Sequence, residues 1–492
     1  MTTAPDASST VHAALQMLDE GLAATVERTF DLLAIPSIST DPAYNAQCAA
    51  CAAWCAEQLS ELGFEASVRP TDGQPMVVGH YKRPGADGAG DGAKRAHVLF
   101  YGHYDVQPAD PLELWTRGPF EPTLQDQAGA VIEVANTPRG EAADALKVVA
   151  RGASDDKGQV MTFIEACRAW LATGSELPID VTILLEGEEE CGSPSVEPFL
   201  RENADELRAD LVLVCDTGQP GPRQPAVTTM LRGLADVEMT VTGPSRDLHS
   251  GMYGGPALNP IRELSRLLAL LHDSDGQVLL PGFYDAVRDI DPDQRAQWET
   301  IGDAAAFLGD VGLTQSAGEA GRSVHELIWA RPTAEVNGIF GGYTGVGTKT
   351  VIPSTATAKL SFRLVADQDP QAIVSSFKAF MEANCHPDAK LSFHSRGGAP
   401  AISFDTGSAA MQAAAAGLRE EWETEPVFMG CGGSIPIVHD FKHKLGMDTL
   451  LIGFAQDDDA IHSPNEKYNV LSLRKGARSW IRIMDQLAQL HG

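Results

Sequence analysis

Basic residues are scarce in this chain of 492 residues, which has 37 Lys and Arg against 67 Asp and Glu and a formal net charge of −30. Nucleic acids and anionic membranes are bound through a basic face, so this deficit argues against both as partners. No apolar run approaches the roughly 18–20 residues that cross a bilayer. The first residues, MTTAPDASSTVHAALQ, lack the basic and then apolar segments of a secretion signal. We therefore expect a cytoplasmic protein.

Cysteine is also sparse, and the 8 residues are scattered in a way that does not suit a disulfide scaffold. Cys48, Cys51 and Cys55 are spaced i, i+3, i+7 in an Ala-rich segment and would share one face of a helix. They could bind a metal through their thiolates. Cysteine commonly serves as a small apolar core residue, however, so core packing is the favoured interpretation.

The chain does contain enough apolar sequence for more than one domain, with 43% hydrophobic and 21% charged residues. From residue 96 to about residue 230, buried-strand runs alternate with helices, which indicates an α/β domain with a largely parallel sheet. After Gly233, strands that alternate apolar and polar residues (234–243 and 355–365) occur with helices at 259–273 and 369–385. This pattern indicates an inserted α+β sandwich. After Pro400 the α/β pattern returns.

The predicted fold is therefore an α/β domain whose mostly parallel sheet is flanked by helices, with an α+β sandwich inserted into it. The first domain would comprise residues 1–232 and 399–492, and the insertion residues 233–398. The Gly-rich segment 85–94 is predicted to be a surface turn.

Five runs of buried-strand type lead to residues that suit a divalent metal. The runs and the residues that follow them are 97–105 with His103 and Asp105, 146–158 with Asp155 and Asp156, 181–190 with Glu188, Glu189 and Glu190, 211–216 with Asp216, and 449–455 with His462. In an open α/β sheet, ligands gather at the carboxyl ends of the strands, so these side chains should meet at one edge. Each alone is more often a cap, a solvated acid or a core histidine. Together they predict a site for two hydrolytic metal ions.

Zn²⁺ accepts imidazole nitrogen and carboxylate oxygen, and a pair of ions needs a bridging carboxylate. Asp155 is the candidate bridge. His103 and Asp216 would complete the site of one ion, and Glu190 and His462 that of the other. Mn²⁺ or Co²⁺ could occupy the same ligand set.

Two further acids near these ligands suit supporting roles. Glu189 directly precedes Glu190 and can act as the general base that takes a proton from water and passes it to the leaving amine. Asp105 lies two residues beyond His103, where it can orient the imidazole.

Three other segments have both a structural and a functional interpretation. His249 in SRDLHSGMYGG either caps a turn or donates a hydrogen bond to a developing oxyanion. Arg363 in SFRLV either forms an exposed salt bridge or clamps a carboxylate. Gly432, Gly433 and Ser434 in GCGGSIPI form either a plain tight turn or a set of backbone N–H donors for an anion.

Eight segments together resemble one family. They are YGHYDVQP, ARGASDDKG, EGEEECGS, VCDT, DLHSGMYGG, SFRL, GGSIP and IHSPNE. The chain resembles the co-catalytic zinc metallopeptidases that include carnosine dipeptidases, cysteinylglycine dipeptidases, aminoacylases and carboxypeptidase G. The match runs in the same order from about residue 20 to the end, and it is closest to the cytosolic non-specific dipeptidases.

The resemblance implies the same metal ligands, the same base and a cis peptide bond between Asp155 and Asp156. It also implies that the inserted domain is a lid that forms a homodimer, with His249 reaching the active site of the partner. The expected activity is hydrolysis of dipeptides or short peptides, whose C-terminal carboxylate Arg363 and the turn Gly432–Ser434 would hold.

One position departs from the family pattern, because Cys431 stands where the carnosine dipeptidase branch often has an acidic residue before GGSIP. If that acid contacts the substrate amine, N-acylated substrates become an alternative, and the chain would be an N-acyl-amino-acid deacylase for acetyl or succinyl amides. A binding protein that has lost catalysis is a more remote alternative, since Glu189 and all five ligands are present.

Overall fold

The computed structural model describes residues 7–81, 95–302 and 304–490, so the predicted turn at 85–94 lies outside the described residues. The chain divides into two compact units. Unit 1 comprises Met1–Thr229, Phe404–Phe428 and Asp440–Gly492, and unit 2 comprises Met230–Ser403 and Met429–His439. Unit 2 thus contains residues 233–398 and also takes in residues 230–232, 399–403 and 429–439, which are predicted from the sequence to belong to the first domain.

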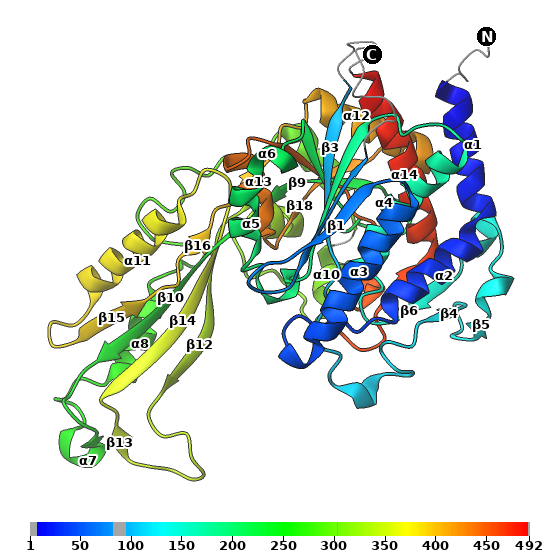
Figure 1. The fold of residues 1–492 in the computed structure, drawn as a ribbon. Helices are drawn as coiled ribbons and strands as arrows, with labels where there is room; N and C mark the ends of the chain where they lie inside the picture. Colours follow the sequence, from blue (N-terminus) through cyan, green and yellow to red (C-terminus); the bar gives the residue numbers. More distant parts are fainter. Residues whose placement is uncertain (1–6, 82–94, 303, 491–492) are drawn as a thin grey trace. The chain divides into compact units, whose positions relative to one another are not determined.

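The largest sheet is mixed and has 9 strands, most of them formed by residues of unit 1 (Figure 1). In spatial order these are β1 (Glu65–Arg69), β2 (Met76–Tyr81), β7 (Asp180–Glu186), β3 (His97–His103), β8 (Leu211–Val214), β19 (Asp448–Leu451), β9 (Ala226–Leu231) and β17 (Ile402–Ser403), with β18 (Val427–Cys431) paired to β9. The four strands from β7 to β19 run parallel, whereas β1, β2, β9 and β17 are antiparallel to their neighbours. The α/β class is confirmed, but the sheet is mixed rather than mostly parallel because antiparallel strands extend both edges.

The central strands are continuous runs of apolar and β-branched residues, as expected for strands buried on both faces. β3 has the sequence HVLFYGH and β7 the sequence DVTILLE, and both are buried along nearly their whole length. Their parallel register pairs His97 with Asp180 and His103 with Glu186. The two strands therefore end side by side.

Helices α4 and α14 pack together against the sheet in the core of unit 1. Phe100 of β3 stacks on Phe163 of α4 with ring centroids 4.1 Å apart, and Trp480 of α14 meets both rings edge-on. α14 also packs against α1 and α12 (Figure 1). The helices outside the insertion are α1 (Ala7–Glu20), α2 (Leu22–Leu33), α3 (Asn45–Glu61), α4 (Lys157–Ala172), α5 (Val196–Glu202), α6 (Ala204–Leu207), α12 (Ala409–Trp422), α13 (Pro436–His443) and α14 (Val470–Gln489).

A second, smaller sheet in unit 1 adjoins the loop after residue 149 and the loop before residue 467. Its order is β20 (Lys467–Asn469), β6 (Lys147–Val149), β4 (Thr123–Gln125) and β5 (Val131–Ile132). All pairings in it are antiparallel.

Unit 2 is a two-layer α+β structure, as predicted for the insertion. Its antiparallel sheet has the order β12 (Thr333–Gly341), β14 (Thr355–Leu364), β10 (Gly233–Thr242) and β15 (Lys390–His394), with β16 (Gly398–Ala399) also paired to β10. Every second residue of β10 is buried, and α8 and α11 pack on this face. The remaining elements of this unit are β11 (Leu248–His249), α7 (Ser250–Tyr253), α8 (Pro260–Ala269), α9 (Pro292–Glu299), α10 (Ala304–Asp310), β13 (Val351–Ile352) and α11 (Pro370–Asn384).

Two further predictions can be compared with the fold. Cys48, Cys51 and Cys55 are fully buried in the core of unit 1, and they belong to no candidate metal cluster in the described residues. Core packing is therefore the correct interpretation of their spacing. Among the described helices, none is long and apolar enough to cross a membrane.

Candidate metal centre

Three of the predicted ligands lie where parallel strands of the large sheet end. His103 is the last residue of β3, Glu190 lies in the short helical turn Glu189–Cys191 after β7, and Asp216 follows β8 by two residues. Because β3, β7 and β8 are parallel neighbours, these ends meet at one edge of the sheet. The reasoning from the strand ends therefore holds for these three residues.

Asp155 and His462 reach the same place by another route. Asp155 lies two residues before α4, in the loop after β6, and His462 lies in the loop before β20. The placement of Asp155 after a strand of the main sheet is therefore wrong, because β6 belongs to the smaller sheet. β6 and β20 pair with each other, which brings the two loops side by side. His462 also adopts a left-handed backbone conformation with φ 60°, which sequence patterns do not predict for histidine.

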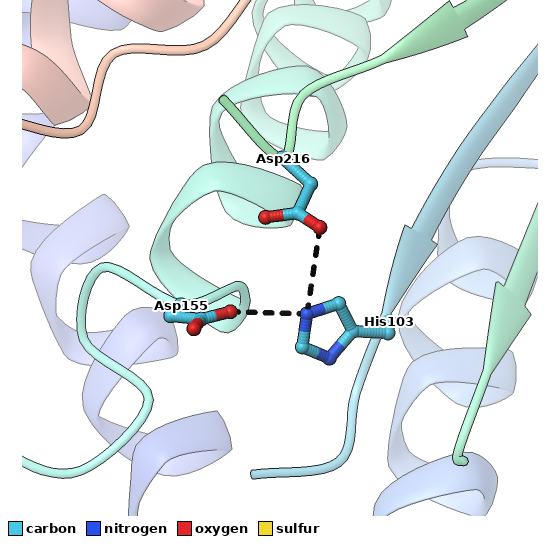
Figure 2. A group of neighbouring side chains, drawn as sticks. All are labelled: His103, Asp155 and Asp216. Carbon is cyan, nitrogen blue, oxygen red and sulfur yellow. Dashed lines mark hydrogen bonds and ion pairs between the residues drawn. The ribbon is translucent and has the colours of Figure 1, made fainter. Parts of the chain in front are cut away.

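The first candidate metal group consists of His103, Asp155 and Asp216 (Figure 2). His103 Nε2 lies 3.1 Å from Asp155 Oδ1 and 4.0 Å from Asp216 Oδ2. The ligand atoms of the three residues lie within 4.8 Å of one another. The His103 side chain is fully buried, so its direction is fixed by packing.

The second candidate group consists of Asp155, Glu190 and His462. His462 Nε2 lies 2.9 Å from Asp155 Oδ2 and 3.3 Å from Glu190 Oε2. Asp155 thus turns one oxygen toward each imidazole, and it is the residue shared by both groups. The two groups are the ligand pairs that the sequence predicts around Asp155.

Asp105 and Gln107 contact the predicted ligands His103 and Glu190 and position them. The Asp105 carboxylate accepts hydrogen bonds from the backbone N–H groups of Glu189 and Glu190, at 3.2 and 3.1 Å. It also lies 3.3 Å from Nδ1 of His103, although the backbone oxygen of Asp105 is slightly nearer to that nitrogen, at 3.1 Å. The Gln107 amide donates to Glu190 Oε2 at 2.8 Å.

Glu466 is a supporting residue that the sequence reasoning missed. Its fully buried carboxylate accepts hydrogen bonds from the backbone N–H groups of Gly152, Ser154 and Asp155, at 2.9, 2.8 and 3.0 Å. Arg151 Nη1 donates to the same carboxylate at 2.8 Å. The loop that carries Asp155 is therefore fixed by a residue four positions after His462. The only signal in the sequence was its place in the IHSPNE segment.

Asp156, also without an assigned role in the sequence analysis, lies behind the cluster. Its Oδ2 accepts from the His103 backbone N–H at 3.2 Å, whereas its buried Oδ1 has no hydrogen-bond partner among the described residues. The peptide bond between Asp155 and Asp156 is cis.

The cluster carries more negative charge than the protein neutralises. Asp155, Asp156, Asp216, Glu189 and Glu190 form no ion pair with a lysine or arginine among the described residues, so the two histidines are their nearest cationic partners. Burial raises the pKa of Asp156, Asp216 and Glu189, and neighbouring carboxylates raise it further. Contacts with Asp155 and Glu190 raise the pKa of His462 to about 10.

This arrangement fits two divalent cations. Imidazole nitrogen and carboxylate oxygen are ligands for Zn²⁺ and for related divalent ions. The excess of buried carboxylates supplies the charge that two cations would neutralise. His103 and Asp216 would hold one ion and His462 and Glu190 the other, with Asp155 between them.

Glu189 lies beside the cluster and belongs to neither metal group. Its backbone N–H is held by Asp105, whereas its carboxylate makes no hydrogen bond to any described residue. The carboxylate is therefore available for proton transfer, and its raised pKa makes it a stronger base than an ordinary glutamate.

The predicted substrate-binding residues belong to unit 2. Arg363 lies on β14, opposite Leu234 of β10 and on the face away from the helices, and it forms no ion pair with a described residue. The backbone N–H groups of Gly432, Gly433 and Ser434 donate no hydrogen bond within the described part of the chain. Both features leave donors available for an anion.

His249 lies at the other end of the unit 2 sheet. It caps α7, and its Nδ1 accepts from the Gly251 backbone N–H at 3.0 Å. β10 and β14 pair from Leu234 with Arg363 to Thr242 with Thr355, and His249 follows beyond Thr242. Eight residues of strand span roughly 26 Å. His249 and Arg363 of one chain therefore cannot contact one small substrate.

Comparison with protein families gives a match to the model described as peptidase family M20/M25/M40 over residues 99–486. A Cys-Gly metallodipeptidase, DUG1 of Candida albicans, is 30% identical over 92% of this chain and 92% of its own length. The beta-Ala-His dipeptidase of Homo sapiens is 28% identical over 82% of this chain and 77% of its own length.

Solved structures give the same result. The dipeptidase Dug1p of Saccharomyces cerevisiae matches with 26% identity and a TM-score of 0.73, over 97% of this chain and 98% of that one. The metallo-carboxypeptidase Sso-CP2 of Sulfolobus solfataricus matches with 29% identity and a TM-score of 0.75, over 94% of this chain and 99% of that one.

Proposed function

This chain belongs to peptidase family M20/M25/M40, and from that premise we propose that it hydrolyses dipeptides and short peptides at a centre of two divalent metal ions. It is a peptidase, and the dipeptidase branch named from its motifs is the branch of its relatives. Zinc is the proposed metal, with Mn²⁺ or Co²⁺ able to occupy the same ligands.

One observation carries the proposal: the Asp155 carboxylate lies between two imidazoles, 3.1 Å from His103 and 2.9 Å from His462. A carboxylate with a histidine at each oxygen offers every ion of a bridged pair one shared and one separate ligand. When bound, the ions would act as Lewis acids and lower the pKa of a water to about 7.

The protein's own part in the reaction is proton transfer by Glu189. Its carboxylate takes a proton from the attacking water and gives it to the nitrogen of the leaving amine, which turns the amine into a good leaving group. Asp105 positions Glu189 by accepting a hydrogen bond from the Glu189 backbone N–H. The same carboxylate lies beside Nδ1 of His103 and orients that imidazole.

Substrate orientation is assigned to unit 2. Arg363 and the free N–H groups of Gly432, Gly433 and Ser434 would bind the C-terminal carboxylate of the peptide. The proposal also makes unit 1 the catalytic domain and unit 2 the lid domain. It places the protein in the cytoplasm.

We further propose that the chain acts as a homodimer through unit 2, in which His249 of one chain stabilises the oxyanion in the active site of the other. The distance between His249 and Arg363 within one chain supports this arrangement. The edge strand β12 and the loop after it also expose apolar side chains, namely Val336, Ile339, Phe340, Tyr343 and Val346. An unpaired strand edge with exposed apolar residues is suited to an interface with a second copy.

The N-acyl-amino-acid deacylase is kept as the second candidate because Cys431, and not a carboxylate, precedes the Gly432–Gly433 turn. A neutral thiol offers no ionic partner for a substrate amine. Rates on Ala-Ala and on its N-acetyl form separate the two activities, because a deacylase prefers the acetylated compound.

The main experiment removes the metal by chelation and restores it with Zn²⁺ while the release of amino acids from Ala-Ala is measured. We expect no activity without metal and recovery on its addition. Activity that persists without metal would contradict the proposal.

A further inference from the structure

The guanidinium of Arg232 is a second cation, besides that of Arg363, at the proposed carboxylate site. It takes no part in the proposed reaction. Arg232 lies directly before β10, two residues from Leu234, which pairs with Arg363. Diagonal neighbours in a sheet have Cβ atoms roughly 7–8 Å apart, within reach of long side chains. Consistent with this, burial lowers the pKa of Arg232 to about 10, and the charge of Arg363 contributes to the shift.

Arg232 is attached to the glycine turn. Its backbone N–H donates a shared hydrogen bond to the carbonyl oxygens of Cys431 and Gly433, at 3.3 and 3.2 Å. Its Nε donates to the carbonyl oxygen of Gly432 at 3.1 Å. A Cβ on Gly432 would come within 3.3 Å of Arg232 Nη2 and 2.9 Å of the Ile328 side chain. The guanidinium is therefore packed against the turn that carries the free N–H groups.

The charge of Arg232 is compensated only weakly within the chain, by the more distant carboxylate of Glu335. Arg232 forms no ion pair with a carboxylate among the described residues, and beyond the Gly432 contact its only other side-chain hydrogen bond there goes from Nη1 to the Leu327 oxygen, at 3.3 Å. Donors on Nη1 and Nη2 remain unused. Several other arginines of unit 2 are paired, such as the buried Arg331 with Glu319 at 2.7 Å and Arg322 with Asp289 at 2.8 Å. An unpaired and largely desolvated guanidinium is costly unless an anion binds to it.

We infer that Arg232 binds a second carboxylate of the substrate, so that the preferred peptides are dipeptides whose C-terminal residue is aspartate or glutamate. This inference rests on the proposed function, in which Arg363 and the turn bind the first, C-terminal carboxylate. Cys431 fits the same substrate, because an acid at that position would repel it, whereas a thiol does not.

The test compares Ala-Glu with Ala-Gln, which have nearly the same shape and differ in one charge. The unchanged chain should give a kcat/KM about 10- to 100-fold higher for Ala-Glu, the range that a charge-assisted hydrogen bond provides. Arg232→Met should bring this ratio close to one, and Arg232→Lys should retain part of it because the charge remains. Arg262→Met, at an exposed arginine of α8, is the control and should leave the ratio unchanged.

The ratio also separates recognition from a purely structural role, since loosening of the turn would lower both rates equally. Equal rates of the unchanged chain on the two peptides, or a ratio that survives Arg232→Met, would overturn the inference. Binding of the products glutamate and glutamine, measured by calorimetry on the metal-loaded chain, gives a second readout. If no dipeptide is cleaved but glutamate still binds more tightly through Arg232, the proposed function fails, whereas the assignment of Arg232 as a carboxylate-binding residue stands. Equal binding of the two amino acids would overturn it.

Discussion

Two groups of buried carboxylates in unit 1 differ in what neutralises them. Between α12 and α14, the fully buried Glu421 contacts the cationic nitrogens of Lys475, Arg478 and Arg482 at 2.9, 2.6 and 2.9 Å. At the metal centre, five carboxylates are accompanied by two histidines and form no ion pair with a lysine or arginine of residues 7–81, 95–302 or 304–490. A buried charge without a partner is strongly unfavourable. The first group is thus complete within the chain, whereas the second has a surplus of carboxylates that two bound cations would neutralise.

Unit 2 contains the opposite case. Arg232 and Arg363 have no carboxylate partner among the described residues, although unit 2 pairs other arginines, such as Arg331 with Glu319. Uncompensated charge of either sign therefore marks the two places where ligands are proposed to bind, and compensated charge marks the places that stabilise the fold.

The largest effect is expected from Asp155→Asn, which keeps the shape of the bridge and removes its charge. Both metal groups share Asp155, so activity on Ala-Ala should fall by more than the roughly 10⁴-fold that general acid–base catalysis alone provides. Bound metal measured by atomic spectroscopy should fall with it. Full metal content together with full activity in this variant would show that Asp155 is not the bridge.

The next largest effect is expected from Glu189→Gln. Because Glu189 belongs to neither metal group, kcat should fall about 10²- to 10⁴-fold while the metal content stays the same. The exposed Glu202→Gln is the control for the substitution itself. If metal were lost together with kcat, Glu189 would be a ligand and not the base.

A smaller effect is expected from Glu466→Gln, which removes the charge that accepts three backbone N–H groups and Arg151. The loop carrying Asp155 would then be less well held, and a loss of about 10- to 100-fold in metal affinity is typical for residues that position ligands. Titration of the metal-free variant with Co²⁺, followed by its visible absorption spectrum, measures this directly. An unchanged affinity and spectrum would mean that Glu466 stabilises the fold alone.

The comparison also explains how far the sequence predicts this site. His103, Glu190 and Asp216 follow buried strands whose apolar runs are easily recognised, and the topology then places their ends together. Asp155 and His462 depend on the pairing of two three-residue strands, β6 and β20, which are too short for a pattern to reveal. The sequence predicts these two residues from the apolar runs at 146–158 and 449–455 and from their residue types, and the strand explanation for Asp155 is wrong because β6 belongs to the smaller sheet.

Supporting residues were harder to predict because their roles exist only in three dimensions. Glu466 and Asp156 act through backbone N–H groups of other segments, and no spacing in the chain encodes such contacts. The absence of an ion pair at Arg232 could not be predicted either, because the sequence does not show whether a carboxylate lies within 4 Å of an arginine.

The smallest effect on catalysis is expected from Glu421→Gln, which alters the compensated group. Breaking this buried cluster should lower the free energy of unfolding by about 3 kcal/mol and leave kcat/KM for Ala-Ala unchanged. Thermal unfolding together with an activity assay at 25 °C measures both. A loss of activity without a loss of stability would contradict the distinction between the two groups.

The pH dependence of this variant sharpens the same point. Burial acts to raise the pKa of Glu421, but the hydrogen bond from Arg478 and the charges of Arg478 and Lys475 lower it overall. A folded-state pKa below the unfolded value, which is about 4.3 for glutamate, contributes stability above that pH and loses it as the pH falls through the folded pKa. The difference in unfolding temperature between Glu421→Gln and the unchanged chain should therefore be largest near pH 7 and shrink below about pH 4.

The most direct test of the metal centre is a titration of the metal-free chain with Zn²⁺, with bound ions per chain and Ala-Ala hydrolysis measured on the same samples. We predict two bound ions per chain at saturation, activity that requires them, and a single ion at most in His462→Ala. Full hydrolysis by a chain that binds no divalent ion, or tight binding of two ions that leaves Ala-Ala uncleaved, would contradict the account.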